Sequence, residues 1–249
     1  MRFMTDLNAK SIMAGLAALL ALPAGAGFAH AQDRDEASPV VVELFMSQSC
    51  NSCPAAAEYI RELAVYDDLI VLSWHVDYWN MLNTKNGRWV DPYSQAAFTK
   101  RQRYYNKNIR HKSSVYTPQI IIGGVSEAPG FKTEKVSALI DEMRPLQTVA
   151  SIKARRTGDD IIFDIKESTN GGNAYLLKLL PEIETDIPRG ENAGHTMKEV
   201  NVITDVQPLG VVRRVGAQLT AAAPEGDASC AIIVQEPRQG RIVAAAYCP

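Results

Sequence analysis

The chain has 249 residues, of which 46% are hydrophobic, 22% charged and 7% aromatic, and this composition excludes disordered and fibrous proteins. The 26 Lys and Arg residues nearly balance the 28 Asp and Glu residues, so the net charge of −2 gives no bulk attraction to nucleic acid or to an anionic membrane. Four cysteines are too few for a disulfide-dense scaffold, and their spacing is therefore more informative than their number.

Residues 1–31 have the pattern of a secretory signal peptide. Arg2 and Lys10 precede a long stretch of apolar and small residues, which closes on the A-x-A cleavage pattern Ala29-His30-Ala31. Pro23 within this stretch disfavours the alternative of an uncleaved anchor helix. No later apolar run approaches the length of a membrane span. We therefore expect a periplasmic or secreted protein without a membrane span after signal removal, in a compartment where disulfides persist.

Residues 32–147 are predicted to form an α/β domain, because strand-like and helix-like patterns alternate from residue 39 onward. Asp91 and Thr133 are typical helix N-caps, and Gly123-Gly124 predicts a hairpin. The expected order is β-α-β-α-β-β-α. The strands are expected over 39–45, 69–76 and 119–122 and from 125, and the helices from 54, from 91 to about 109, and from 133.

Residues 148–249 have a different pattern and are predicted to form a β-rich domain. Turn residues separate the strand candidates, and no amphipathic helix is evident. This pattern favours an antiparallel sandwich, or a sheet that covers the first domain. The candidate strands are 151–156, 161–166, 175–180, 199–206, 230–235 and 241–247.

Cys50 and Cys53 form a C-x-x-C motif between the first predicted strand and the first predicted helix. A helix N-terminus presents unpaired backbone N–H groups and the positive end of the dipole, and both stabilise a thiolate and lower the pKa of a thiol. Two intervening residues let the second thiol reach the first, so a mixed disulfide can be resolved within one molecule. This position favours a redox-active pair.

Two structural alternatives stay open for this pair. One is a static disulfide, which is common in secreted proteins. The other is half of a zinc site, although the sequence has no second C-x-x-C to complete it.

The segment Tyr116-Thr117-Pro118 lies directly before the predicted strand 119–122. Together with the C-x-x-C, the element order and the Gly-Gly hairpin, it resembles the thioredoxin fold. In that family a proline at this place has a cis peptide bond, faces the dithiol and lies beside backbone that binds substrate. The resemblance implies that Pro118 is cis, that Thr117 faces the substrate, that Cys50 attacks and that Cys53 resolves.

Four segments carry more specific motifs: ELFMSQSCNSCP (43–54), SWHVDYW (73–79), VYTPQ (115–119) and RGEN (189–192). They resemble a secreted bacterial family with a thioredoxin-like fold that is described as a domain of unknown function. This resemblance runs from about residue 40 to 247. It implies the fold and secretion, and it implies no substrate.

The motif departs from ordinary thioredoxins in the position of its proline. Pro54 follows Cys53 and does not lie between the two cysteines, and no Trp precedes Cys50. Because a residue before proline is pushed away from helical dihedrals, Cys53 is expected near the cap position. Which of the two sulfurs is more activated therefore stays open.

Cys230 and Cys248 are predicted to form a structural disulfide. They end two strand candidates that are joined by residues 236–240, and a hairpin centred on residue 239 would place them directly opposite each other. Closing a loop of this size would contribute about 3 kcal/mol in the chain-entropy model.

His75, Asp77 and Trp79 end the second predicted strand, near the expected position of the dithiol, and are predicted to line the substrate site. His75 could transfer protons to a thiol, and Asp77 could orient it or act as a base. The alternative is a hydrogen-bonded polar layer under a Trp/Tyr lid, because alternation along a strand can bury His75. The RGEN segment is either a functional loop or a boundary loop.

Three functions stay open. The leading one is a thiol–disulfide oxidoreductase that uses Cys50 and Cys53 without a cofactor and acts on protein or small-molecule thiols and disulfides. The second is a copper or zinc carrier, or metallochaperone, with Cys50, Cys53 and His75 as ligands. The third is a binding module on a thioredoxin-like fold in which the cysteines form a permanent bridge.

Overall fold

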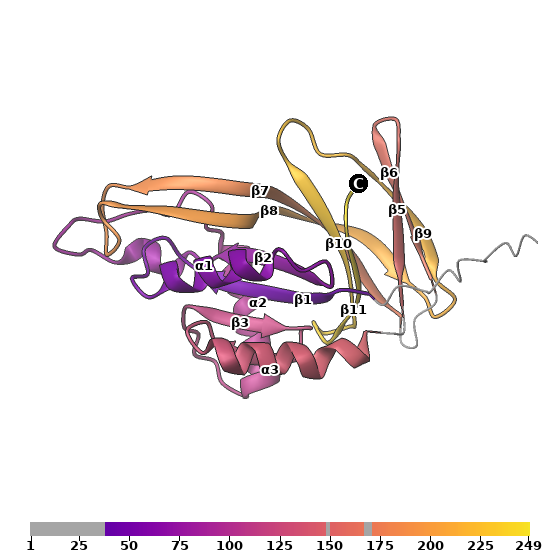
Figure 1. Ribbon diagram of the computed structural model, residues 1–249, viewed down its shortest axis with the longest axis horizontal. Helices are drawn as coiled ribbons and strands as arrows, with labels where there is room; N and C mark the ends of the chain where they lie inside the picture. The colour runs from indigo at the N-terminus through magenta and orange to yellow at the C-terminus, as the bar shows by residue number, and fades with distance from the viewer. Residues whose placement is uncertain (1–37, 148–149, 167–170) are drawn as a thin grey trace, which may run out of the picture. The chain divides into compact units, whose positions relative to one another are not determined.

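The central element of the structure, a computed structural model, is one large mixed sheet of eight strands (Figure 1). The structure describes residues 38–147, 150–166 and 171–249, and the expected signal peptide lies outside these ranges. In spatial order the strands are β11 (Ile242–Tyr247), β10 (Ser229–Gln235), β7 (Gly172–Ile187), β8 (His195–Val212), β2 (Leu69–His75), β1 (Val40–Met46), β3 (Gln119–Ile122) and β4 (Ser126–Pro129).

Strand β1 is buried along its whole length, which explains its continuous apolar run. It pairs in parallel with β2 and antiparallel with β3. Its side chains alternate between two apolar clusters, because successive residues of a strand point to opposite faces of a sheet. Val42 and Leu44 belong to the cluster under α1 and α3, whereas Val41 and Phe45 belong to the cluster with Trp74.

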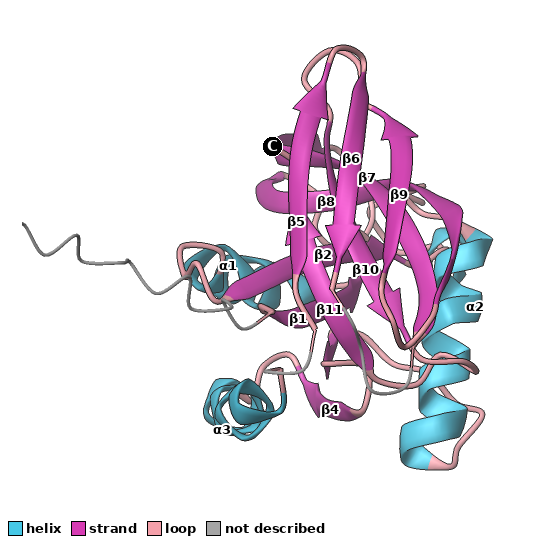
Figure 2. Cartoon of the chain, turned by 90° about the vertical axis from the view of Figure 1, so that its right-hand side faces the viewer, coloured by secondary structure: helices cyan, strands magenta, loops and turns pink. Residues whose placement is uncertain are grey.

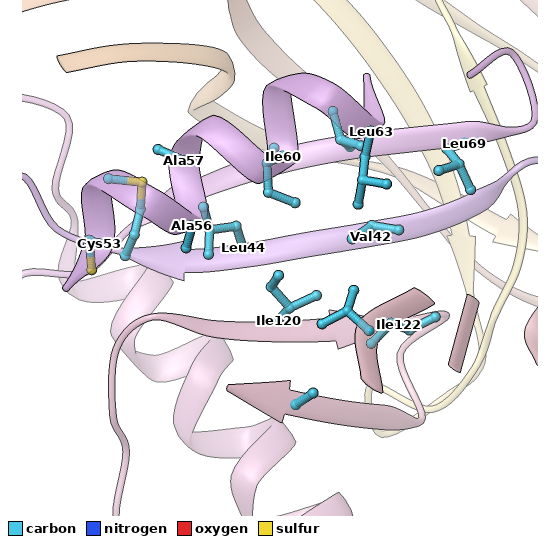
Figure 3. Close-up of a cluster of buried hydrophobic side chains, with 14 of the residues drawn as sticks. Val42, Leu44, Cys53, Ala56, Ala57, Ile60, Leu63, Leu69, Ile120 and Ile122 are labelled. Atoms are coloured by element: carbon cyan, nitrogen blue, oxygen red, sulfur yellow. The ribbon is translucent and has the colours of Figure 1, made fainter. Parts of the chain in front are cut away.

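Few helices cover this sheet, and they lie on both of its faces. Figure 2 shows α1 and α3 on one side and α2 on the other. The helices are α1 (Cys53–Leu63), α2 (Ala96–Tyr105) and α3 (Thr133–Met143), with short turns η1 (Tyr78–Met81), η2 (Asn106–Arg110) and η3 (Arg144–Leu146). Ala56, Ile60 and Leu63 form the buried face of α1, at the spacing of one helical face (Figure 3).

The starts of two helices differ from the prediction. Asp91 is not an N-cap, and α2 begins five residues later at Ala96. The Asp91 carboxylate instead accepts hydrogen bonds from the backbone N–H groups of Gln48 and Tyr93 and contacts His75. Thr133 is the first residue of α3 and not its cap, which is Lys132.

The later part of the chain contributes to two sheets. Strands β7, β8, β10 and β11 complete the central sheet, and β5 (Ile152–Thr157), β6 (Asp160–Ile165) and β9 (Ala217–Ala222) form a second one. An apolar cluster with Phe163, Leu176 and Ile232 packs between the two sheets. The described residues form one compact unit, and the expected boundary at 147 does not separate the sheets.

The hairpin expected around residue 159 is present, and β9, which pairs with β6, is a strand that the sequence pattern does not predict. Strands β7 and β8 are far longer than expected, and they form a hairpin that runs alongside α1 (Figure 1).

Cys230 and Cys248 form a disulfide, with their Cα atoms 5.2 Å apart. The cross-strand pair next to it, Ala231 opposite Tyr247, has the register that the sequence spacing predicts. Among the described residues, no helix combines the length and apolarity that a membrane crossing requires.

Candidate functional site

Cys50 and Cys53 lie at the connection between β1 and α1. Strand β1 ends at Met46, a tight turn follows, and α1 begins at Cys53 with Pro54 in its first turn, where the missing N–H of proline costs no helical hydrogen bond. The turn is closed by hydrogen bonds from Cys50 N to Ser47 O (3.0 Å) and from Cys53 N to Cys50 O (3.1 Å). Both cysteines are free thiols, and both are fully buried.

Cys50 is surrounded by hydrogen-bond donors. A hydrogen bond from the Cys53 thiol lowers the pKa of Cys50 most, burial opposes it, and the Ser52 and Thr117 hydroxyls and the Ser52 backbone N–H lower it further, to about 6. The Ser52 Oγ lies 3.3 Å from Cys50 Sγ and makes no capping hydrogen bond to α1. Near neutral pH, Cys50 is therefore a thiolate.

The second thiol shifts in the opposite direction. Burial raises the pKa of Cys53 well above its usual value, and the hydrogen bond to Cys50 and the Cys50 charge raise it further. Cys53 therefore holds the proton that it shares with the Cys50 thiolate. This division leaves Cys50 as the more nucleophilic sulfur and Cys53 as the protonated one.

Thr117 and Pro118 lie beside this pair. The peptide bond between them is cis, and the Thr117 hydroxyl contributes to the lowered pKa of Cys50. The indole Nε1 of Trp79 donates a hydrogen bond to Thr117 Oγ1 at 2.7 Å, which holds Trp79 at the site. Pro118 approaches α1 across Gly130, where an added Cβ would lie 3.0 Å from Pro118 Cβ and 2.9 Å from Ala56 Cβ.

His75 and Asp77 have other partners. His75 is fully buried, with Nδ1 2.8 Å from Asp91 Oδ2 and Nε2 3.3 Å from Glu199 Oε1. Burial lowers the pKa of His75, but the two carboxylates outweigh it and raise the value to about 9. Asp77 accepts a hydrogen bond from Thr99 Oγ1 at 2.5 Å. The structure thus brings Trp79 to the thiols and binds His75 into a buried ionic cluster.

Gln48, two residues before Cys50, is a residue that the sequence analysis missed. It is fully buried, and each of its polar groups has a hydrogen-bond partner. Its backbone N–H donates to Asp91 Oδ2 (2.8 Å), and its side-chain Nε2 donates to Glu199 Oε2 (2.7 Å). Its side-chain Oε1 accepts from Trp89 Nε1 (3.2 Å). The buried ionic cluster therefore holds the loop that leads to Cys50. In the sequence, the only sign of this role is a polar residue just after a buried strand.

The turn between β7 and β8 carries the RGEN segment to this loop. Asn192 Nδ2 donates to Gln48 O (2.8 Å) and to Cys50 O (3.0 Å), and Glu191 Oε2 accepts from Asn51 N (3.0 Å). Gly190 packs against Trp89, with 3.0 Å from an added Cβ to Trp89 Cβ. This turn therefore covers the cysteine loop.

No arrangement of three or more His, Cys, Asp or Glu side chains that could hold a metal ion occurs within residues 38–147, 150–166 and 171–249. Both ring nitrogens of His75 face carboxylates and not the cysteines. The three side chains of the expected copper or zinc set are thus not gathered at one point.

Comparisons with known proteins agree with this fold without naming an activity. A family model described as "Protein of unknown function (DUF1223)" matches residues 41–235. A crystal structure of an Agrobacterium tumefaciens protein, a structural genomics target, has a TM-score of 0.74 and 26% sequence identity over 86% of this chain and 95% of that one. HBP35 of Porphyromonas gingivalis has a TM-score of 0.54 and 13% identity, over 85% and 74% of the two chains. No curated protein matches the sequence.

Proposed function

The chain belongs to the DUF1223 family, and we propose that it is a periplasmic or secreted thiol–disulfide oxidoreductase that works through Cys50 and Cys53 on a thioredoxin-like fold. The observation that carries the proposal is the pair of free thiols at the start of α1, with Ser52 Oγ 3.3 Å from Cys50 Sγ, and the opposite pKa shifts of the two thiols support it. The pKa of Cys50 is lowered to about 6, and that of Cys53 is raised well above 9.0. An activated nucleophile beside a protonated resolving thiol is the arrangement that disulfide exchange needs.

The order of elements from β1 to α3 supports the thioredoxin-like part of the proposal. It runs β-α-β-α-β-β-α over residues 40–143, with the C-x-x-C between β1 and α1. The cis bond before Pro118 and the Thr117 hydroxyl beside the thiols are the features that the resemblance to thioredoxins implies. A fold alone does not give an activity, so the thiol chemistry carries the argument.

The reaction needs no cofactor. The Cys50 thiolate attacks one sulfur of a substrate disulfide, an S–S bond forms to Cys50, and the first substrate thiolate leaves. Cys53 then gives up its proton and attacks Cys50 Sγ, which releases the second substrate thiolate and leaves a Cys50–Cys53 disulfide. Two electrons pass to the substrate, and the reverse sequence oxidises a substrate dithiol.

Access to the thiols is part of the proposal, because both cysteines are fully buried in this conformation. The groups above the cysteine loop are Asn192, Glu191 and Trp89. Exchange with a protein or small-molecule substrate therefore requires a local movement that exposes Cys50 Sγ. The location outside the cytoplasm rests on residues 1–31, which lie outside the described residues.

The same burial favours a second candidate, a binding module in which the cysteines serve only structure. In that case the pair is a permanent bridge when oxidised and inert when reduced. Reactivity separates the two candidates. An oxidoreductase exchanges disulfides at neutral pH, whereas the binding module leaves both sulfurs unmodified.

Trapping is the test of the proposed activity. In a Cys53→Ala variant, Cys50 has no resolving partner, so mixed disulfides with substrate are expected to accumulate on Cys50. The Cys50→Ala variant, which keeps Cys53, is the matched control and is expected to trap nothing. Absence of trapped species, together with absence of dithiol–disulfide exchange by the unchanged chain, would contradict the proposed function.

A further inference from the structure

One peptide unit at the site is held at both of its polar ends by the β7–β8 turn. The carbonyl of Cys50 accepts a hydrogen bond from Asn192 Nδ2 (3.0 Å), and the N–H of Asn51 donates to Glu191 Oε2 (3.0 Å). The two holding residues are neighbours in sequence, and so are the two held groups. The orientation of this peptide depends on ψ of Cys50 and φ of Asn51. A rotation of the peptide therefore changes the backbone from which the Cys50 side chain extends.

Asn192 is itself firmly placed. It is only 4% exposed, and the same Nδ2 also donates to Gln48 O (2.8 Å). Gly194 N donates to Ile187 O (2.8 Å), which closes the turn that carries Asn192. Asn192 is buried, donates two hydrogen bonds and lies in the turn of a long hairpin, so it is suited to holding the loop in one orientation.

We propose that Asn192 and Glu191 are positioning residues, which clamp the Cys50–Asn51 peptide and so fix Cys50 Sγ among its hydrogen-bond donors. The inference rests on the proposed function and assigns to the β-rich part of the chain a role in the redox site. Asn192 bonds the Cys50 carbonyl and Glu191 bonds the Asn51 N–H, so both residues act through the peptide that they hold.

The electrostatics of Cys50 explain why this orientation matters. The groups that lower its pKa are all short-range donors: the Cys53 thiol, the Ser52 hydroxyl and N–H, and the Thr117 hydroxyl. No Lys, Arg or His is among them. Tyr78 also faces the pair, and its pKa is raised chiefly by burial, while the Glu191 carboxylate lies on the adjoining Asn51 N–H. Hydrogen bonds weaken steeply with misalignment, so a rotated Cys50–Asn51 peptide would return the thiol toward its usual pKa of 9.0.

The test is the pH midpoint of Cys50 alkylation in the reduced full chain, followed peptide by peptide by mass spectrometry. The midpoint is the chosen readout because loosening of the cover changes access at every pH but does not shift a titration. For Asn192→Ala we expect the midpoint to rise by about one pH unit or more, which lowers the thiolate fraction at pH 6 about fivefold. The matched control is Asn86→Ala, because Asn86 bonds the same turn at Gly190 O (3.4 Å) without touching the clamped peptide.

A second pair of variants covers the case in which Asn192→Ala does not fold. Glu191 is exposed, and Glu191→Gln and Glu191→Ala carry the same charge, so the difference between them reports the hydrogen bond alone. We expect a higher midpoint for Glu191→Ala than for Glu191→Gln. Equal midpoints for these two variants would overturn the inference, as would an unshifted midpoint in a folded Asn192→Ala protein. An unchanged chain that alkylates with a midpoint near 9 and exchanges no disulfides would instead contradict the proposed function.

Discussion

The two cysteine pairs of this chain show how the local backbone decides what a pair of sulfurs can do. Cys230 and Cys248 face each other across antiparallel strands and are joined, with Cys248 N also bonded to Cys230 O (2.8 Å). Cys50 and Cys53 lie at a helix start, remain free and differ strongly from each other in pKa. A register pair on two strands gives a symmetric bridge, whereas the donors around Cys50 and the burial of Cys53 shift the pKa values of these two thiols in opposite directions.

The sharpest way to break this comparison is to disable each pair in turn by substitution. Cys50→Ser is expected to reduce disulfide exchange to background, about 100-fold or more, because a hydroxyl has no thiolate at neutral pH. The double variant Cys230→Ser with Cys248→Ser is expected to keep its exchange rate. Loss of exchange in the double variant, measured with a model disulfide on folded protein, would show that the pairs are not independent.

For the free energy of unfolding, the order of the two effects is reversed: loss of the terminal pair has the larger effect. Removing the Cys230–Cys248 bond is expected to lower the free energy of unfolding by about 3 kcal/mol in denaturant titration, because the bond closes an 18-residue separation in the unfolded chain. Cys50→Ser provides the control, because no covalent bond is lost. A loss in that control as large as in the double variant would contradict the structural assignment of the terminal pair.

The smallest expected effect is at Thr117. The change Thr117→Val keeps the shape and removes the hydroxyl that lies beside both thiols and accepts from Trp79. Because this hydroxyl is one of several donors, the pKa of Cys50 is expected to rise by less than about one unit. The control is Thr220→Val, because Thr220 lies in β9 of the second sheet. An unchanged alkylation midpoint would show that Thr117 does not stabilise the thiolate.

Local pattern was enough to predict the elements that carry the thiols. The apolar run of β1, the face of α1 and the Gly-Gly hairpin are each decided within a few residues, and the register of Cys230 and Cys248 follows from their spacing. The prediction failed at Asp91 because its carboxylate is used by Gln48, 43 residues away in sequence, and not by a helix.

The residues that surround the thiols could not be predicted from local sequence pattern. Gln48 meets Glu199 across 151 residues and Asn192 meets Cys50 across 142, so no local pattern reports either contact. The lengths of β7 and β8 were underestimated because the far ends of both strands are largely exposed and lack the apolar run that marks a buried strand. The RGEN segment can be recognised as a motif in the sequence, but its contact with the Cys50–Asn51 peptide cannot.

The most direct test of the account is a titration of the two thiols one by one, by NMR of the reduced full chain labelled at the cysteine Cβ carbons. The account predicts a midpoint near pH 6 for Cys50, with the thiolate present above that pH and lost below it, and a midpoint above 9 for Cys53. Two midpoints that both lie near 9, or a lower midpoint for Cys53 than for Cys50, would contradict it.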